Sequence, residues 1–196
     1  MPRMVGTAGL CLLGPCAALV ALGPREVLAQ AGQLSPAQVI SLAAAGTSTL
    51  TIIITAGAVQ SIAGVTDNSV NSFPSPVTIL TAWDVNPGQT NSVELMAFFS
   101  VPSQALVGGP TQIPSGRVLG RVTTGLPIAF TPMTQSAVGG VGTAGGSLHL
   151  FTQAITGANK TASRTDNLEL QLNLTGFPAL APGIYTGTLN LRAVIQ

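Results

Sequence analysis

The sequence predicts an all-β protein built as an antiparallel β-sandwich, and three observations lead to this prediction. Apolar and polar residues alternate in several segments, which is typical of strands that bury one face. The 23 glycines and 14 prolines separate these segments at short spacing, as in sandwiches and barrels. Helical periodicity is nearly absent, and 196 residues are enough for one domain with a substantial core.

The first three expected strands lie in the first half of the chain. In Thr49–Thr55 the residues Leu50, Ile52 and Ile54 are expected on one face, and three threonines, Thr49, Thr51 and Thr55, on the other. Val77–Trp83 stands between prolines and an Asn-Pro-Gly turn signal. Val93–Val101 places apolar residues at every second position, and Val101 is the last of them. Each segment therefore predicts a strand with one face toward the core.

The strands expected in the second half end with the two clearest ones. Arg117–Val122 and Ile128–Thr131 alternate weakly, and Leu148–Ile155 alternates better. In Leu168–Leu174 every second residue is leucine, with polar residues between the leucines. Tyr185–Ile195 has apolar residues on one side and threonine, asparagine or arginine on the other. These last two segments predict amphipathic strands that pack on the core.

Residues 30–46 fit two conformations, a helix or an extended strand. Ser35-Pro36-Ala37-Gln38 has the pattern of a capping box with proline at the first helical position, and Gly46 would end that helix. The alternation that a strand requires is carried by three apolar residues, Ile40, Leu42 and Ala44. Both alternatives stay open, because helix propensity is a weak guide to tertiary structure.

The first 29 residues have the pattern of a secretory signal peptide. Arg3 supplies the positive start, and a long uncharged, largely apolar run follows it. Val27-Leu28-Ala29 gives the small-residue cleavage pattern, and a cut after Ala31 fits nearly as well. We therefore expect three parts: a signal peptide (1–29), an N-terminal extension (30–46) and a sandwich domain (47–196).

Cleavage at this position would change the chemistry of the remaining chain. Cys11 and Cys16 leave with the signal peptide, so the secreted chain is expected to have no thiol and no disulfide. Its apolar run leaves with it, so no membrane anchor is expected either. Removal of Arg3, Arg25 and Glu26 leaves five basic and five acidic residues. A net charge near zero permits self-association. It gives no basic surplus for nucleic-acid binding.

Catalytic motifs are scarce, and each has a structural explanation. Gly140–Gly145 reads GxGxxG, but the next residues predict a strand rather than the helix that a dinucleotide site requires. His149 is the only histidine, and the sequence has no GxSxG nucleophile motif. Arg164 and Asp166 are expected in the turn before a strand. We expect no enzyme activity, no cofactor and no metal site, because the titratable residues are scattered.

The C-terminal segment carries a family resemblance. Counted back from Gln196, Gly183 is the fourteenth residue, and apolar residues occupy the second, fourth, sixth and eighth positions: Ile195, Ala193, Leu191 and Leu189. Together with Tyr185 in the turn-plus-strand stretch, this ending resembles that of chaperone–usher pilins and spore coat protein U-like secreted domains. The resemblance covers about the last thirty residues well. The sequence departs from the family at Ile195, where an aromatic residue is usual, and in lacking the disulfide of many pilins.

The resemblance implies an incomplete immunoglobulin-like sandwich that a donated N-terminal strand completes. Its partners would be other copies of the chain, in a homopolymer, with a periplasmic chaperone and an usher. The chaperone would grip the C-terminal strand through Gly183, Tyr185, Leu189, Leu191, Ala193 and Ile195. The donor residues would be Ile40, Leu42 and Ala44 of the N-terminal extension.

The leading functional prediction is therefore a secreted, pilin-like structural subunit of a fimbrium at the bacterial cell surface. The alternative is a secreted, monomeric sandwich that binds glycan or protein through loops Ala105–Pro114 and Ala137–Gly146. Neither loop contains an aromatic residue, which weakens a glycan site. A hydrolase comes third and would require a serine or carboxylate within hydrogen-bonding reach of His149.

Overall fold

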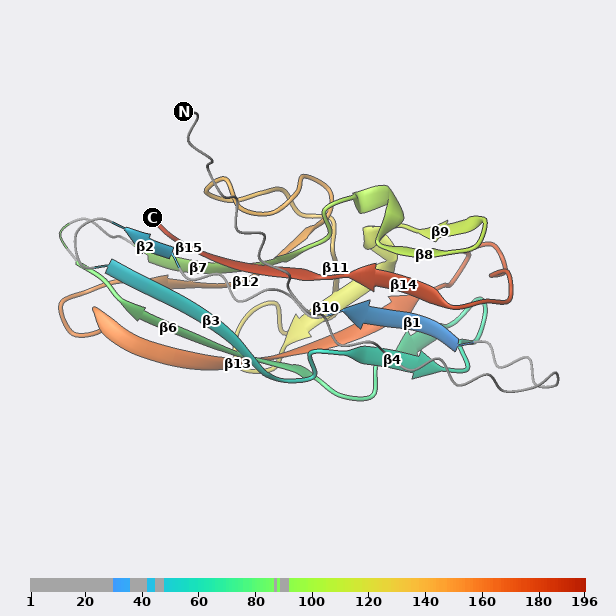
Figure 1. The fold of residues 1–196 in the computed structure, drawn as a ribbon, viewed down its shortest axis with the longest axis horizontal. Helices are drawn as coiled ribbons and strands as arrows, with labels where there is room; N and C mark the ends of the chain where they lie inside the picture. The colour runs from blue at the N-terminus through green and yellow to red at the C-terminus, as the bar shows by residue number, and fades with distance from the viewer. Residues whose placement is uncertain (1–29, 36–41, 45–47, 87, 89–91) are drawn as a thin grey trace, which may run out of the picture.

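The computed structural model describes residues 30–35, 42–44, 48–86, 88 and 92–196, which form an almost entirely β structure. Nearly all strand pairs are antiparallel, and together the sheets enclose one hydrophobic core (Figure 1). The predicted all-β antiparallel sandwich is thus confirmed. Among the described residues, no helix has the length and apolar character needed to cross a membrane.

The largest sheet contains the longest strands of the molecule. Its order is β11-β10-β13-β6-β3-β2, and β5 pairs with one end of β13. The strands are β2 (Leu42–Ala44), β3 (Ser48–Ala56), β5 (Val70–Ser72), β6 (Val77–Asp84), β10 (Val118–Val122), β11 (Thr131–Pro132) and β13 (Thr161–Asn173). The alternating leucines of β13 are buried as predicted, because one face of this sheet covers the core.

Two smaller sheets complete the structure. A three-stranded sheet has the order β12-β7-β15, from β12 (Ser147–Ala154), β7 (Ser92–Phe98) and β15 (Asn190–Ile195). A five-stranded sheet has the order β4-β1-β14-β8-β9, from β1 (Gln30–Ser35), β4 (Gln60–Ala63), β8 (Leu106–Gly108), β9 (Thr111–Ile113) and β14 (Tyr185–Thr188). Short 3₁₀ turns, η1 (Pro102–Gln104) and η2 (Ser115–Arg117), flank the β8–β9 hairpin.

Two strand predictions extend too far. β7 ends at Phe98, and Val101 is 49% exposed because Pro102 begins the η1 turn directly after it. Of Ile128–Thr131, only Thr131 is in a strand, the two-residue β11. Ile128 is 71% exposed, so this short apolar stretch belongs to a surface loop.

The assignment of Arg164 and Asp166 to a turn is wrong. Both lie inside β13, which begins at Thr161, seven residues before the predicted start at Leu168. Opposite Thr161–Leu168, strand β6 pairs residue by residue from Asp84 to Val77. The first half of β13 is mostly polar, so its sequence does not show the alternation that predicts a strand. It pairs with β6 nevertheless, because backbone hydrogen bonds do not depend on side-chain hydropathy.

The described parts of the N-terminal extension are strands. Gln30–Ser35 forms β1 and Leu42–Ala44 forms β2, so these two stretches take the extended alternative rather than the helix. The rest of the extension, including Ile40, lies outside the described residues. β1 pairs antiparallel with β4 and parallel with β14.

Candidate functional site at the C-terminal strand

The predicted C-terminal strand is divided between two sheets. β14 lies in the five-stranded sheet, and β15 lies in the three-stranded sheet beside β7. Leu189 separates them and is only 5% exposed, so the junction itself is anchored in the core. A strand that changes sheets in this way forms a corner of a sandwich. The C-terminal segment therefore holds two sheets together.

The side chains of this segment follow the predicted alternation. Tyr185, Leu189 and Leu191 are buried, while Ala193 and Ile195 are half-buried and pack against the core. The Tyr185 hydroxyl donates a hydrogen bond to the carbonyl oxygen of Ala181 at 3.0 Å. This bond satisfies the one polar group of the buried tyrosine.

The outer edge of β15 carries unpaired backbone groups among the described residues. Ser92 and Gln196 exchange two backbone hydrogen bonds, of 3.0 and 2.9 Å, at one end of the β7–β15 ladder. In an antiparallel ladder, hydrogen-bonded pairs alternate with pairs whose N–H and C=O groups point away from each other. Leu191, Ala193 and Ile195 therefore direct their backbone groups away from β7, and β15 has no second partner strand in the described part of the chain.

This edge lies at the border between two sheets. β15 approaches β3 of the large sheet, and Figure 1 shows that β15 ends near the end of the molecule at which β3 begins. A free edge of this kind can accept the backbone of another extended segment. Alternate side chains of such a segment would point to the same face of the sheet.

The structure places the predicted donor residues beside β3. Leu42 pairs with Leu50, and Ala44 pairs with Ser48, both within the same chain. Ile40 lies outside the described residues. Gly183 precedes β14 in an irregular segment and has open space around its Cα. Leu42 and Ala44 thus lie on the edge strand β2 of the large sheet, whereas Leu191, Ala193 and Ile195 lie on or beside the core in β15 of the three-stranded sheet.

Close backbone approach fixes β14 against the β8 hairpin. A Cβ atom on Gly187 would lie within van der Waals overlap of the carbonyl oxygen of Ala105. A Cβ on Gly108 would lie 2.7 Å from the Tyr185 ring. These two glycines permit contact that any larger residue would prevent. Beside them a groove of about 290 Å³ lies between the hairpin and the C-terminal segment, with Val101, Val107 and Thr186 in its lining.

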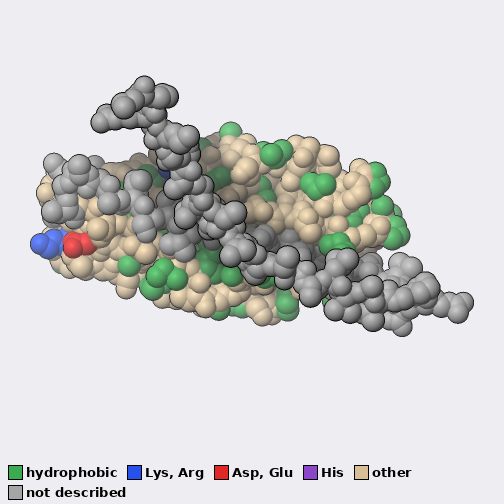
Figure 2. All heavy atoms as spheres, viewed as in Figure 1, with side chains coloured by type: hydrophobic (Ala, Val, Ile, Leu, Met, Phe, Trp, Pro, Cys, Tyr) green, Lys and Arg blue, Asp and Glu red, His purple; other side chains and the backbone are tan. Residues whose placement is uncertain are grey.

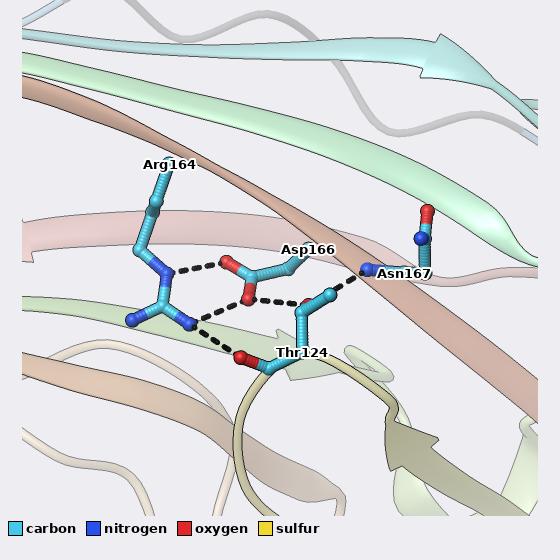
Figure 3. Close-up of polar contacts among 4 residues, drawn as sticks. All are labelled: Thr124, Arg164, Asp166 and Asn167. Atoms are coloured by element: carbon cyan, nitrogen blue, oxygen red, sulfur yellow. Dashed lines mark hydrogen bonds and ion pairs between the residues drawn. The ribbon is translucent and has the colours of Figure 1, made fainter.

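A second polar centre lies on the large sheet, where Arg164 and Asp166 meet Thr124 (Figure 3). Arg164 Nε donates to Asp166 Oδ2 at 2.8 Å, and Arg164 Nη2 donates to Asp166 Oδ1 at 2.6 Å. The Thr124 hydroxyl donates to Asp166 Oδ1 at 3.0 Å. The Arg164 guanidinium also covers the Phe151 ring at 4.2 Å. Both oxygens of this buried carboxylate accept hydrogen bonds from protein groups, so the centre ties the loop that holds Thr124 to β13.

His149 has polar neighbours on the outer side of the three-stranded sheet. Its Nε2 atom lies 3.0 Å from the Thr152 hydroxyl and 3.9 Å from Glu94 Oε2. A catalytic triad uses the two imidazole nitrogens separately, one for the nucleophile and one for the acid. Here both neighbours approach the same nitrogen, and the carboxylate lies beyond hydrogen-bonding distance.

The Gly140–Gly145 segment is a loop of turns that leads directly into β12. Its backbone positions with positive φ, including Gly140 at 74° and Gly142 at 98°, require glycine. Ser115, next to the β8–β9 hairpin, donates to the Gly145 carbonyl at 3.0 Å. The two stretches predicted as binding loops therefore adjoin, although Ala105–Pro114 consists mostly of the β8–β9 hairpin.

The described residues contain no group of three or more histidines, cysteines or carboxylates placed to hold a metal. No family model matches the chain, and a search of curated proteins found no match. The fold and the site define an all-β antiparallel sandwich. Its C-terminal segment changes sheets, and β15 has a partner on only one side among the described strands.

Sequence reasoning missed two features of this site. The division of Tyr185–Ile195 at Leu189 has no counterpart in the alternation, although Gly187 in its middle is the kind of residue that marks a bend. Glu94 and Met96 are also buried, so β7 is covered on both faces rather than one. The sequence of β7 does not indicate that both of its faces are buried, since a glutamate such as Glu94 normally marks an exposed position.

Proposed function

We propose that the protein is a secreted, pilin-like structural subunit of a filament at the bacterial cell surface, and that it assembles by β-strand addition. The observation that carries this proposal is the outer edge of β15, which has no partner strand in the part of the chain that the structure describes. Leu191, Ala193 and Ile195 there combine free backbone groups with side chains turned toward the core. An added strand would gain main-chain hydrogen bonds from the edge and specificity from the apolar side chains.

The surface composition supports packing between copies of the chain. Where Figure 2 shows described residues, the face consists mostly of backbone atoms and side chains that are neither hydrophobic nor charged, with scattered hydrophobic side chains and with acidic and basic side chains at one end. Two of the ten charged side chains of the sandwich are engaged in the Arg164–Asp166 pair and two more in the Arg121–Glu169 pair. Little charge repulsion therefore opposes close association.

The donor would be the N-terminal extension of a second copy. Its alternating residues Ile40, Leu42 and Ala44 would enter beside Leu191, Ala193 and Ile195. Such contact is heterologous, because the donor and acceptor surfaces differ, and its repetition produces an open filament. Before assembly a periplasmic chaperone would protect the same strand, and an usher would guide export.

The first test is negative-stain electron microscopy of the secreted chain from Gln30, beside a chain that begins at Gly46. Filaments from the longer chain alone are expected. Substitution of Ile40 and Leu42 by aspartate in the longer chain should also abolish filaments while leaving the sandwich folded. Filaments from the chain that begins at Gly46 would contradict the assignment of the donor.

A second test acts on the acceptor. Ala193→Pro removes an N–H that points away from β7, so the fold should persist while strand addition fails. The control is Ala193→Ser, which keeps the N–H at this position and should assemble normally. Thr186→Pro cannot serve as a control, because β14 is paired on both sides and the proline would disturb the fold itself. Normal filaments from Ala193→Pro would show that the β15 edge is not the acceptor.

A further inference from the structure

We propose that the outer face of the large sheet carries a binding site for a neutral saccharide, in a groove over β5, β13 and β10. The groove has a volume of about 350 Å³, which lies within the range of small-molecule sites. None of its lining residues belongs to β15, or to the loops Ala105–Pro114 and Ala137–Gly146. The inference therefore goes beyond the proposed function and does not depend on it.

Four polar side chains line the groove at two paired positions of neighbouring strands. Arg121 of β10 pairs with Glu169 of β13, and Gln171 of β13 pairs with Ser72 of β5. Glu169 and Gln171 are two residues apart on one strand, so their side chains point to the same face of the sheet. The register of three strands thus gathers a guanidinium, a carboxylate, an amide and a hydroxyl on one face.

Phe130 forms one apolar wall of the groove. It directly precedes β11, and Thr131 of β11 pairs with Gly120 of β10. The next position on β10 is Arg121, so this register brings the Phe130 ring to the guanidinium. The Arg121 Cζ atom lies 4.5 Å from the centre of the ring. The aromatic side chain is therefore held beside the polar groups rather than in the core.

The second apolar wall is the connection Phe73–Pro76, between β5 and β6. The Phe73 backbone N–H donates to the carbonyl oxygen of Leu170 at 3.1 Å, which fixes the connection to β13. Pro74 and Pro76 each lock one backbone dihedral angle, so this wall is stiff. A sugar ring has apolar C–H faces as well as hydroxyl groups, and walls of this kind are suited to contact those faces.

The contacts within the groove leave complementary polar atoms for a ligand. Arg121 Nε and Nη2 both approach Glu169 Oε2, at 2.8 and 2.7 Å. Arg121 Nη1 and Glu169 Oε1 thus have no hydrogen-bond partner among the described residues. The Gln171 amide donates to Ser72 Oγ at 3.2 Å, and its Oε1 accepts no hydrogen bond from a described residue. Each hydroxyl group of a sugar both donates and accepts, so neighbouring hydroxyls can use these donors and acceptors together.

The charges in the groove favour a neutral ligand. Arg121 and Glu169 carry opposite charges and are the only charged residues that line it. An anion would be repelled by Glu169, a cation would be repelled by Arg121, and either would compete with an ion pair that is already formed. A neutral polyhydroxy ligand can hydrogen-bond to both partners without separating them. The two side chains are 39% and 33% exposed, so a ligand can reach them.

Nuclear magnetic resonance of the ¹⁵N-labelled secreted chain from Gln30 tests this site. The probes are glucose, galactose and mannose, with glucosamine and N-acetylneuraminate as charged counterparts. At least one neutral sugar should shift the amide signals of Ser72, Phe130 and Gln171 in a saturable manner. The dissociation constant should lie in the millimolar range, because the ligand is small and the groove is open to solvent. The charged sugars should bind more weakly.

A matched pair of variants distinguishes recognition from packing. Arg121→Gln should weaken binding of the neutral sugar by about tenfold, because it removes charged donors from the groove. Arg117→Gln is the control: Arg117 also covers a phenylalanine ring, that of Phe177 at 5.2 Å, but does not line the groove. Its binding should equal that of the wild type. The amide spectrum of each variant shows whether the fold persists.

A charge exchange provides a second variant that keeps the ion pair. Arg121→Glu combined with Glu169→Arg retains opposite charges at these paired positions but exchanges donor and acceptor. It should also weaken binding by about tenfold, although its fold and stability should be close to those of the wild type. Wild-type affinity in this variant would show that the arrangement of donors and acceptors does not recognise the ligand.

Methyl glycosides of the same sugars distinguish two sources of the ligand. Equal binding of the methyl glycoside assigns the groove to a sugar within a glycan, and binding of the free sugar alone assigns it to a free saccharide. Three results would overturn the site: no saturable shift with any neutral sugar, tighter binding of a charged sugar, or equal weakening by Arg121→Gln and Arg117→Gln.

Discussion

β13 and β15 look alike in sequence and differ in their edges. Both alternate apolar and polar residues, and β13 directs several leucines into the core while β15 directs one, Leu191. β13 is paired with β6 and β5 on one side and with β10 on the other. β15 is paired only with β7 among the described strands. Alternation therefore reports a buried face, whereas the capacity to bind another strand depends on the edge, which alternation does not report.

The buried polar centre of β13 offers the largest expected effect. Asp166→Ala should lower the free energy of unfolding by about 3 kcal/mol, because it leaves the Arg164 guanidinium beside the core without its counter-charge. Urea unfolding followed by tryptophan fluorescence measures this change. Asp84→Ala is the matched control, because Asp84 is the exposed last residue of β6. It should lower the free energy of unfolding by less than about 0.5 kcal/mol. A loss below about 1 kcal/mol for Asp166→Ala would show that the pair is not structural.

The two sides of β15 should respond differently to proline. Val194→Pro removes the N–H that faces Glu94 of β7 and should cost about 2–3 kcal/mol. Ala193→Pro removes an N–H on the free edge and should cost less than about 1 kcal/mol. Thermal unfolding of the two variants measures the difference. Equal losses would mean that the outer edge of β15 is also paired.

A smaller loss is expected where β14 meets the hairpin. Gly187→Ala should cost about 2 kcal/mol, because the new methyl group collides with the Ala105 carbonyl and forces β14 away from β8. Gly157→Ala, whose position has open space, is the control and should change stability by less than about 0.5 kcal/mol. A neutral Gly187→Ala would indicate that β8 and β14 can separate without cost.

The smallest expected effect is a gain in the large sheet. The Thr81 hydroxyl is fully buried and has no hydrogen-bond partner among the described residues. Thr81→Val keeps the shape and should raise the free energy of unfolding by about 1 kcal/mol. Thr78→Val, which removes the 3.0 Å contact with Asn167, should instead lower it by about 1 kcal/mol. Calorimetry of the two variants gives the sign of each change in the free energy of unfolding. A lower free energy for Thr81→Val would show that the Thr81 hydroxyl has a hydrogen-bond partner.

Prediction from sequence succeeded where one buried face decides the structure. Leu168–Leu174 and Val77–Trp83 lie in β13 and β6 with their apolar faces inward. Prediction failed for Arg164 and Asp166, because charged residues close together in sequence are typical of turns. The residues that pair with them in the strand are distant in sequence and give no local signal. Thr124 lies about forty residues before Asp166, and no local pattern links the two.

The alternation in the sequence predicted which side chains of the C-terminal segment face the core, but it did not predict the geometry of the segment. The alternation from Tyr185 to Ile195 correctly identified the inward side chains. The transfer of the segment from one sheet to another at Leu189 was not foreseen, since both halves keep the same alternation. The extended conformation of Gln30–Ser35 was also undecided from sequence, because its pairing energy comes from β4 and β14.

The sequence by itself determined the class of fold and the inward face of β6 and of the second half of β13. These follow from local patterns: the period-two burial of apolar side chains and the turns made by glycine and proline. Only the tertiary structure decided which strands are neighbours, where the C-terminal segment changes sheets and which edge of β15 is open. Those features depend on backbone hydrogen bonds, which are chemically the same for every residue except proline and so leave little trace in the sequence.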